Sequence, residues 1–506
     1  MSENRAIVIG SGFGGLAAAV RLGARGYDVT VLEKLDAPGG RAYVYRQDGF
    51  VFDAGPTIIT APFLFEELWS LCNKDMHDYI DLRAIDPFYR IRFDDGTHFD
   101  YSGDDEAMRN EVSKFSPDDV AGYKKFLAAS REVYNVGFED LLHVSFDKFW
   151  SMLKVLPDLV RVQFYRSVYS LVARYIKHPK LRMVFSFHPL LVGGNPFTTT
   201  AVYTLIAHLE RSHGVHFAMG GTGSLVNGLV DLIEGQGNRV RCDAEVTQIL
   251  TRGRKAYGVE LTNGETIEAD VIVSNADSAS TYKRLLSGSR RRRWTDRRLK
   301  RAKYSMSLFV WYFGTDRRYE DVPHHMILLG RRYQQLLEDI FDHKVLAKDF
   351  SLYLHRPTAT DESLAPEGCD AFYVLSPVPH VKSGVDWSKM AEVYRKAIAA
   401  SLADTVMPDL ESHIATSHML TPDDFNDRLN SEQGAAFGLQ PILTQTAWFR
   451  PHNRSEEYES LYLVGAGTHP GAGLPGVISS AKVLDEIVPD VPMHSMPQTE
   501  MQESAG

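Results

Sequence analysis

The sequence predicts an α/β fold in which a parallel sheet begins at the N-terminus, is completed by strands far along the chain, and holds an inserted, mixed α+β domain. The apolar run Ala6–Ile9 enters a glycine-rich turn, and an alanine-rich helix follows it. A second apolar run, Asp28–Leu32, stands where a βαβ unit places its next strand. Strand signals return at Ala269–Ala276 and Leu461–Val464, as when distant segments complete one sheet. These observations predict a Rossmann-like core.

The glycine turn has the spacing of a dinucleotide-binding motif. Gly10, Gly12 and Gly15 form G-x-G-x-x-G, in which the glycines permit a tight turn, a close approach to a diphosphate, and helix packing. The diphosphate would lie at the helix N-terminus, where free N–H groups favour negative charge. Glu33 ends the second strand and is placed to accept hydrogen bonds from ribose hydroxyls.

The residues after Glu33 favour FAD over NAD. Lys34 and the segment Pro38–Ala42 follow without a second helix, and Arg41 offers a planar donor fork to a diphosphate. The segment Phe50–Thr57, which contains Asp53, comes next. The alternative for Arg41 and Asp53 is a surface ion pair.

Composition limits the class of protein. The chain has 506 residues, 44% of them apolar and 24% charged, which indicates a globular protein of two intertwined domains. The net charge of −10 argues against a nucleic-acid binder. Cys72, Cys242 and Cys369 have no metal-ligand or CxxC spacing, so we expect buried, reduced thiols in the cytoplasm and no metal site. No signal peptide or bilayer-spanning run is visible, so a soluble or peripheral membrane protein is expected.

Two basic segments raise the question of a membrane. Residues 138–180 are helical, aromatic and interleaved with Lys and Arg, which fits a membrane interface or, equally, helices that face the core with cations outward. Residues 284–303 hold a cationic cluster that is either a solvated face or a site for anionic lipid headgroups.

Several further elements are expected between these segments. An Asp-Gly turn joins a hairpin over residues 88–101, and strands 308–313 and 372–375 belong to the second domain. Gly220–Leu225 opens a helix and is either an N-cap or a second phosphate cradle. Residues 239–242 and 244–249 are expected to be paired strands, and a hairpin turns at Gly264.

The closing segment carries the resemblance to a known family. A strand at Leu461–Val464 runs into a glycine-rich loop, and a helix is expected from about Gly476. With this segment the chain resembles the bacterial-type phytoene desaturases, which have the flavin amine-oxidase-like fold. Thr468 stands where many flavoproteins of this fold have an acid, so no carboxylate–ribityl contact is expected there. The stretches that carry the resemblance are Gly10–Gly15, Pro38–Tyr45, Phe52–Thr60, Ser186–Phe197, Ser351–His355, Ala447–Arg454 and Tyr462–Ile478.

The resemblance implies an FAD-binding domain in three parts. We expect FAD binding from residues 1–95, 236–285 and 431–487, a mostly helical substrate- and membrane-facing segment over 96–235, a substrate domain over 286–430, and a disordered tail over 488–506. The residues expected to bind FAD are Gly10, Gly12, Gly15, Glu33, Lys34, Gly40, Arg41, Asp53, Gly55, Val246, Gly467 and Val477.

The implied reaction introduces C=C bonds into 15-cis-phytoene, with hydride transfer to FAD. Resemblance to the lycopene-forming members predicts four steps at the cell membrane, on a C40 substrate held in an apolar tunnel, with quinone or oxygen as acceptor. His188 and His469 have the chemistry of a weak base, although a structural role is commoner for each, so no catalytic residue is assigned. The alternatives are another carotenoid desaturase (neurosporene-forming, or acting on hydroxylated or methoxylated intermediates), a carotene cis–trans isomerase, and a non-enzymatic prenyl carrier on the same fold. An amine oxidase is disfavoured because no aromatic-flanked cysteine for covalent flavin attachment is evident.

Overall fold

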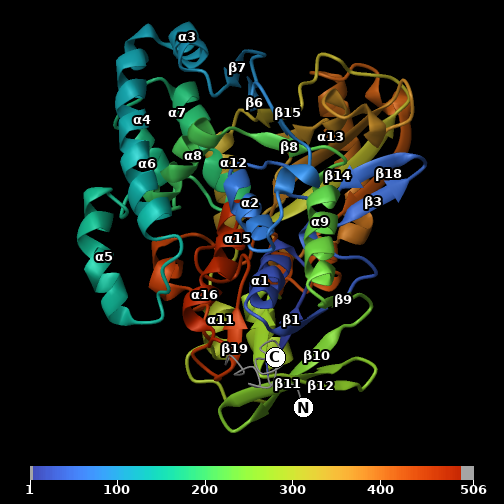
Figure 1. The fold of residues 1–506 in the computed structure, drawn as a ribbon. Helices are drawn as coiled ribbons and strands as arrows, with labels where there is room; N and C mark the ends of the chain where they lie inside the picture. Colours follow the sequence, from blue (N-terminus) through green and yellow to red (C-terminus); the bar gives the residue numbers. More distant parts are fainter. Residues whose placement is uncertain (1–3, 492–506) are drawn as a thin grey trace, which may run out of the picture.

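A five-stranded parallel sheet forms the base of the molecule in the computed structural model, which describes residues 4–491 except for the side chains of Phe149 and Ser151. Each neighbouring pair of its strands runs parallel, and helix α1 (Phe13–Ala24) packs between α9 (Thr222–Gly235) and α15 (Leu474–Lys482) (Figure 1). The predicted completion of the first βαβ unit by distant strands is confirmed. In spatial order the strands are β19 (Leu461–Leu463), β13 (Val271–Ser274), β1 (Arg5–Ile9), β2 (Asp28–Leu32) and β9 (Arg239–Arg241).

The expected pairing of residues 239–242 with 244–249 is wrong. Strand β9 joins the parallel sheet beside β2, whereas β10 (Val246–Arg252) pairs with β11 (Lys255–Leu261) in a separate antiparallel sheet. The short stretch between them, Cys242–Glu245, carries the chain from one sheet to the other. The hairpin predicted at Gly264 is confirmed, because β12 (Thr266–Glu268) pairs antiparallel with β11.

The second domain is built on a seven-stranded mixed sheet. Its central strands β14 and β17 are the apolar runs predicted near residues 308–313 and 372–375, and they pair antiparallel along their whole length. The face that holds Phe309, Trp311 and Phe313 packs on α13 (Trp387–Ala403). In spatial order the strands are β18 (Ile414–Leu420), β14 (Ser307–Thr315), β17 (Asp370–Val378), β16 (Leu352–His355), β15 (His325–Leu329), β6 (Tyr89–Phe93) and β7 (His98–Tyr101).

The predicted hairpin over residues 88–101 is β6 and β7, both in this second sheet, so the expected domain boundary at residue 95 falls in its turn. Two small ribbons connect the domains. They pair β3 (Val44–Gln47) with β4 (Phe50–Asp53), and β5 (Leu82–Ala84) with β8 (His216–Ala218).

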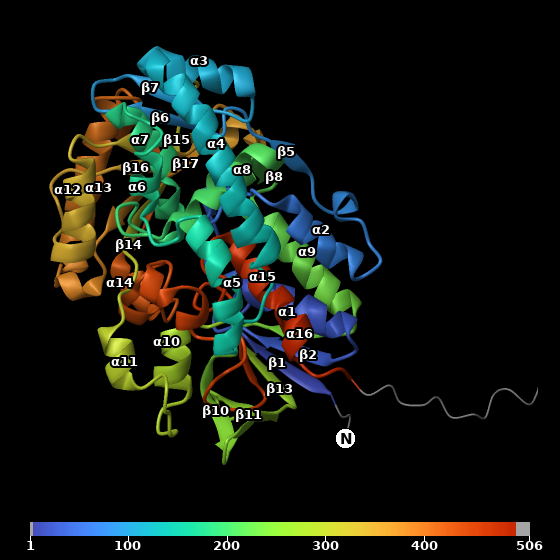
Figure 2. The ribbon, with the colours of Figure 1, turned by 90° about the vertical axis from the view of Figure 1, so that its left-hand side faces the viewer.

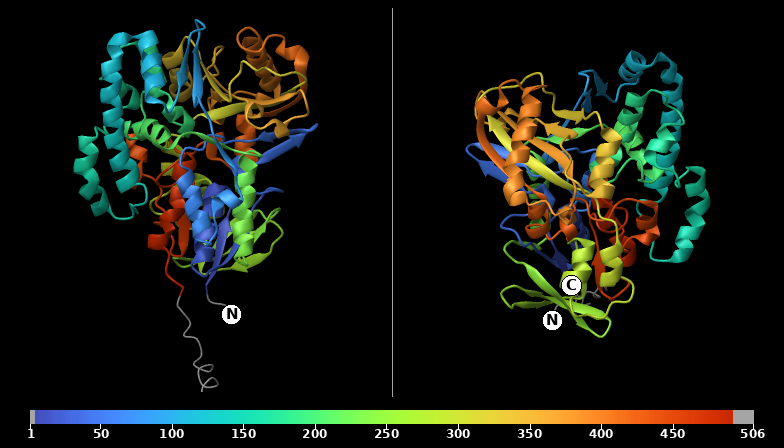
Figure 3. Two further views of the ribbon diagram at one scale, coloured as in Figure 1. Left: turned by 45° about the horizontal axis from the view of Figure 1, so that its top comes forward. Right: turned by 180° about the vertical axis from the view of Figure 1, so that it is seen from behind.

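A group of helices covers one side of the molecule, on the left of Figure 1, and α5 lies outermost there and in the rear view of Figure 3. This group comprises α3 (Asp105–Phe115), α4 (Val120–Tyr134), α5 (Phe149–Arg161), α6 (Val168–Val172), α7 (Pro179–Ser186) and α8 (Leu205–His213). The other helices are α2 (Pro62–Ser70), α10 (Ser278–Ser280), α11 (Asp296–Arg301), α12 (Tyr333–Glu338), α14 (Pro422–Asp427) and α16 (Leu484–Ile487). Figure 2 shows α12 and α13 on the opposite flank from α1 and α9.

The last described residues, the three cysteines and the lengths of the helices can each be compared with the prediction from the sequence. Val488 and Pro489 accept hydrogen bonds from Arg25, so the first residues of the expected tail are held against α1, and residues 492–506 lie outside the described part. The three cysteines are free, as expected, but half-buried rather than buried. Among residues 4–491, every helix is too short or too polar to cross a bilayer.

Candidate functional site

A cavity of about 1100 Å³ lies between the two sheets. At one end it is lined by the glycine turn, the end of β2 and the closing segment, and at the other by apolar side chains from α5, α8 and the seven-stranded sheet. Most residues predicted to bind the cofactor line this cavity. They are Gly10, Gly12, Glu33, Lys34, Gly40, Arg41, Gly55, Val246 and Val477.

The glycine turn presents an uncapped helix end to the cavity. Gly10 has a φ of 89°, a left-handed conformation that favours glycine. Gly12 is the N-cap of α1, so no side chain caps the helix, and its first turn holds no acid. A Cβ on Gly14 would lie 2.6 Å from Asn275 Oδ1 and 2.9 Å from the backbone nitrogen of Gly465, which keeps both loops close. This geometry fits a diphosphate on the helix N-terminus.

Glu33 fixes the first loop and faces the cavity. Its Oε2 accepts hydrogen bonds from the Ser11 backbone N–H (2.8 Å) and hydroxyl (2.6 Å), and its Oε1 accepts one from the Leu35 N–H (2.9 Å). A carboxylate has about four acceptor positions. Glu33 therefore holds the protein loop and can still accept a bond from a hydroxyl group in the cavity.

The segment after Glu33 folds back onto the glycine turn. The Gly39 N–H donates to the Ser11 carbonyl oxygen, and a Cβ on Gly40 would lie 3.5 Å from the Gly12 Cα. Gly55 packs on the same segment, because a Cβ there would lie 2.6 Å from the Arg41 carbonyl oxygen. The Lys34 ammonium donates to the Asp427 carbonyl oxygen at the cavity edge.

Arg41 supplies a half-buried positive charge at the cavity. Its Nη2 donates to the Ser431 hydroxyl, while its Nε has no partner among residues 4–491. Burial lowers the pKa of the guanidinium, and the charge of Asp277 raises it again. Burial also raises the pKa of Asp277, whose carboxylate accepts the N–H groups of Ala279 and Ser280. A half-buried guanidinium whose buried Nε–H is unpaired fits an anionic ligand.

Asp277 is a site residue that sequence reasoning missed. Its position just after β13, at the carboxyl end of a parallel strand, is where α/β sheets bind ligands, and that signal was readable.

Asp53 has a different role from the one expected. It does not line the cavity; its carboxylate accepts the N–H groups of Thr222 (2.8 Å) and Gly223 (3.3 Å) at the start of α9. Burial raises the pKa of Asp53 to about 6. The surface ion pair with Arg41 is not formed, and the helix N-terminus considered as a second phosphate cradle is filled by this carboxylate.

Gly15 and Gly467 also lie behind the cavity wall. A Cβ on Gly15 would lie 2.0 Å from the Gly10 carbonyl oxygen, so this glycine allows α1 to pack against the turn, as predicted. A Cβ on Gly467 would lie 2.7 Å from the Ser278 hydroxyl. Both glycines shape the loops that line the cavity.

The closing loop is held by polar contacts from behind. Arg450 is buried and donates to the carbonyl oxygens of Leu439 and Ala466. The Thr468 hydroxyl donates to the Pro451 carbonyl oxygen, so this residue anchors the loop. Helix α15 begins at Leu474, earlier than predicted, because Pro475 occupies its first turn, where proline is favoured.

The two histidines named as candidate bases have different surroundings. His469 lines the cavity, and its Nε2–H donates to the Leu141 carbonyl oxygen, while burial lowers its pKa to about 4. His188 lies behind the wall with its Nε2 3.1 Å from Glu210 Oε2. Glu210 reaches the cavity, and its other oxygen accepts a hydrogen bond from the Tyr89 hydroxyl.

Comparisons with known proteins agree on the family. The family model described as flavin containing amine oxidoreductase matches residues 13–483. The chain is 50% identical over 494 residues to the phytoene desaturase (neurosporene-forming) of Cereibacter sphaeroides, covering 97% of this chain and 95% of that protein. It is 49% identical over 476 residues to the phytoene desaturase (lycopene-forming) of Pantoea ananas, covering 94% and 97%.

Solved structures share the fold. A putrescine oxidase bound to putrescine has a TM-score of 0.63 at 14% identity, over 96% of this chain and all of that one. The cyclohexylamine oxidase of Brevibacterium oxydans has a TM-score of 0.60 at 15% identity, over 96% and 98%. The fold thus has the flavin amine-oxidase architecture that the sequence predicted. The chain belongs to the flavin-containing amine oxidoreductase family and, within it, to the bacterial-type phytoene desaturases.

Proposed function

We propose that this protein is an FAD-dependent desaturase that converts 15-cis-phytoene to all-trans-lycopene in four successive dehydrogenations. One observation carries the proposal: a single cavity joins a dinucleotide-type glycine cradle to a long apolar compartment. A C40 hydrocarbon offers no polar group, so burial of apolar surface is its main source of binding energy. Apolar cavity residues include Phe138, Leu142, Leu159, Leu308, Val310 and Leu375.

The chain's own residues prepare the cavity for cofactor and substrate. The N-terminus of α1, Glu33 and Arg41 would hold the diphosphate and ribose of FAD. When bound, FAD supplies the acceptor for the hydride that leaves an allylic carbon. The apolar wall orients the polyene chain and excludes water from the positive charge that hydride loss leaves behind. Quinone or oxygen is the proposed final electron acceptor.

Helix α5 is the proposed route to the membrane. It exposes apolar side chains outward, with Trp150 73% and Val160 49% exposed, while Met152 and Leu159 line the cavity. Tyr165 is also exposed, as are Leu443 and Phe449 from the closing part of the chain. An apolar surface above the apolar end of a cavity fits a helix that lies in the bilayer interface and admits a lipid-soluble substrate.

The basic segment 284–303 contributes less charge than its composition suggests. Arg291 pairs with Asp296, and Arg293 lies against Glu456 and over the Trp448 ring. The basic segment lies beside the surface below α5, because Arg293 stacks on Trp448 and residues 447–449, which include Trp448, contact α5. Seven exposed cations of this segment are proposed to attract anionic headgroups: Arg284, Arg290, Arg292, Arg297, Lys300, Arg301 and Lys303.

The function is tested with anaerobic, FAD-loaded protein and phytoene in liposomes. We expect bleaching of the flavin absorbance together with a multi-peaked polyene band, whose position counts the conjugated double bonds. A band that stops at neurosporene would reassign the product, as in the Cereibacter sphaeroides relative. An unchanged flavin would contradict desaturation. Isomerisation of a cis-carotene by the reduced protein would instead indicate an isomerase, and colourless protein that binds no FAD would favour the carrier.

Membrane docking is tested on α5. We expect the double substitution Trp150→Glu and Leu153→Glu to lower co-sedimentation with phosphatidylglycerol vesicles at least about tenfold, because two charged side chains would have to enter the interface. The matched control is Val393→Glu on α13, which is 60% exposed on another flank. Equal binding by wild type and the α5 variant, with normal flavin content, would contradict the docking surface.

A further inference from the structure

One face of the seven-stranded sheet holds a row of tyrosines and histidines across its strands. Tyr312 is paired in register with Tyr373, Tyr373 with His355, and His355 with His325. The Tyr89 ring on β6 lies next in the row, with its centroid 5.9 Å from that of His325. All five side chains are buried. Of these five residues only Tyr373 lines the cavity, so most of the row lies behind a wall whose other residues on this face are mostly apolar.

Tyr353 connects this row to the cavity. It stands two residues before His355 on β16, so the two side chains share a face. Tyr353 lines the cavity, and its hydroxyl oxygen lies 2.7 Å from His325 Nδ1. The Tyr373 hydroxyl also lines the cavity but bonds to Thr57 (2.7 Å), which lies 3.3 Å from the Tyr353 hydroxyl. Of these two neighbouring phenols, Tyr353 is the one that bonds to an imidazole.

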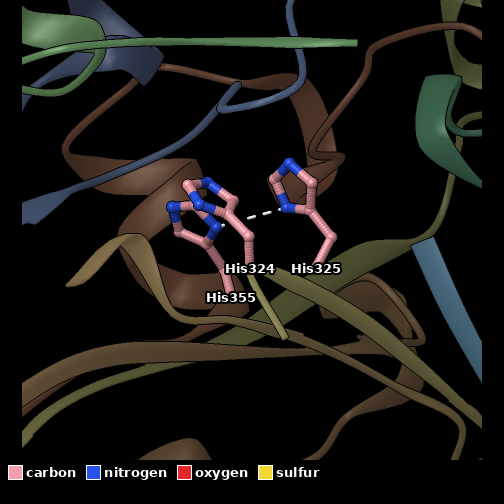
Figure 4. A group of neighbouring side chains, drawn as sticks. All are labelled: His324, His325 and His355. Atoms are coloured by element: carbon pink, nitrogen blue, oxygen red, sulfur yellow. Dashed lines mark hydrogen bonds between the residues drawn. The ribbon is translucent and has the colours of Figure 1, made fainter. Parts of the chain in front are cut away.

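Burial keeps both partners of the Tyr353–His325 hydrogen bond neutral. Burial raises the pKa of Tyr353 well above 10, so the phenol is protonated. Burial, with the neighbouring His324 and His355, lowers the pKa of His325 well below 6.5, so the imidazole is neutral. In the Nε2–H tautomer of His325, which the proposal below assigns, the phenol donates to the Nδ1 lone pair. Figure 4 shows this nitrogen turned toward His355, whose Nδ1 is 3.3 Å away.

The three histidines are close enough together to ligate a metal ion, with nitrogens within 4.8 Å of one another. Two features oppose a cation there. The Nδ1 of His325 is engaged by the Tyr353 proton, and the buried Arg356 guanidinium lies near His324, whose pKa falls to about 3 through burial and this charge. Neutral imidazoles behind a phenol are better suited to accept a proton than to bind a metal ion.

Other possible bases also line this cavity, among them His469, whose Nε2–H donates to the Leu141 carbonyl oxygen, and Glu210. Both oxygens of Glu210 are already engaged, one by the Tyr89 hydroxyl and one by His188 Nε2. The Nδ1 of His325, by contrast, is reached from the cavity through a single phenol.

We propose that Tyr353 and His325 together accept the proton released in each desaturation step, an inference that rests on the proposed desaturase function. The hydride leaves one allylic carbon with both electrons of its C–H bond. The adjacent carbon then loses a proton, and the electrons of that C–H bond form the new C=C bond. The proton passes to the Tyr353 oxygen while the phenol proton passes to His325 Nδ1, which leaves a neutral phenol and an imidazolium.

A weak base is sufficient for this step, because a C–H bond next to an allylic cation is strongly acidic. A base with a low pKa also releases its proton readily when the cycle closes. Reduction of a quinone or oxygen by the hydride equivalent consumes one proton, so the stored proton returns along the same path. Tyr353 would act as the catalytic residue that faces the substrate. His325 would position the Tyr353 phenol and accept its proton.

The test compares two phenols that differ in one partner. In anaerobic single-turnover reactions with phytoene liposomes, we expect Tyr353→Phe to slow growth of the new polyene band on the order of 100-fold, the typical size of a general acid–base contribution, because that band appears only after the proton has left. Tyr373→Phe, which removes the neighbouring phenol that has no imidazole partner, should slow it less than about threefold. The KM for phytoene should change little in both, because each substitution leaves the aromatic ring in place.

A second variant separates hydrogen bonding from proton acceptance. His325→Asn places an amide oxygen near the Nδ1 position, which preserves the bond from Tyr353 but cannot take its proton. We expect it to be as slow as Tyr353→Phe while flavin content and thermal midpoint stay close to those of the wild type. Independently of activity, ¹⁵N NMR of histidine-labelled holoenzyme should show His325 as the neutral Nε2–H tautomer from pH 8 down to about pH 5.

Each contrary result points to a different alternative. Wild-type protein that phytoene does not bleach overturns the proposed function and this inference with it. Wild-type bleaching with equal rates for Tyr353→Phe and Tyr373→Phe overturns the inference alone. A Glu210→Gln variant slower than Tyr353→Phe moves the base to Glu210. One equivalent of metal in the holoenzyme, lost in His325→Asn, overturns the proton role in favour of a metal site.

Discussion

Gly15→Ala is expected to yield a protein that no longer retains FAD. The new Cβ would lie 2.0 Å from the Gly10 carbonyl oxygen and 3.2 Å from the Asn275 side chain. Neither neighbour can withdraw freely, because the Gly10 N–H bonds to the Leu32 carbonyl oxygen and Asn275 Nδ2 bonds to that same Gly10 oxygen. Helix α1 must shift away from the turn, and the N–H groups that hold the diphosphate shift with it. We expect FAD affinity to fall about 100-fold or more, equivalent to about 3 kcal/mol.

The measurement is the ratio of flavin to protein absorbance after purification, followed by titration with FAD. Gly235→Ala is the matched control, since it adds the same methyl group in the last turn of α9 and meets only Lys74 Nζ, at 3.6 Å. Alanine there should keep flavin content unchanged and slightly stabilise the helix. Full flavin occupancy in Gly15→Ala would show that the cofactor does not depend on this turn.

The parallel sheet was largely readable from the sequence, because its signals are local. Gly10, Gly12 and Gly15 mark a turn whose spacing is fixed by backbone geometry, and the apolar runs around it are short and clearly bounded. The same holds for the Asp-Gly hairpin after β6. The pairing predicted within residues 239–249 was wrong because local signals identify two adjacent strands but do not indicate which sheet each strand joins.

The polar row could not be predicted, because it depends on long-range register. Tyr312, His325, His355 and Tyr373 are distant in sequence and meet only when four strands align. Asp53 shows the same limit at a single residue. The segment Phe50–Thr57 that contains Asp53 follows the predicted cofactor-binding segment Pro38–Ala42 in the sequence. The Asp53 carboxylate nevertheless caps a distant helix, which begins at Thr222.

The choice between a membrane helix and a core helix also required the structure. The sequence of α5 is apolar and basic, which both interpretations allow. The structure shows that Leu159 lines the cavity and that Trp150 and Val160 are exposed, and docking of the exposed face on a bilayer is the proposal tested above. A helix that is apolar on two faces can serve the cavity with one face and a bilayer interface with the other.

Asp370→Ala is expected to be the most destabilising substitution near the site. Asp370 is fully buried and pairs with the buried Arg356 at 3.1 Å. Its carboxylate also accepts hydrogen bonds from the Thr358 hydroxyl (2.6 Å) and the Tyr319 N–H (2.8 Å). Alanine would leave a buried guanidinium without a counter-charge and two donors without acceptors. Loss of one partner of a buried pair costs about 3–5 kcal/mol.

Chemical denaturation of FAD-loaded protein measures this cost, with Asp81→Ala as the control. Asp81 pairs with Arg83 on the surface, where both side chains are at least half exposed, so its loss should cost less than about 1 kcal/mol. The comparison also bears on the histidine cluster, because Arg356 without Asp370 would face His324 uncompensated and oppose protonation of the cluster further. A variant that unfolds like Asp81→Ala would show that the Arg356 charge is neutralised some other way.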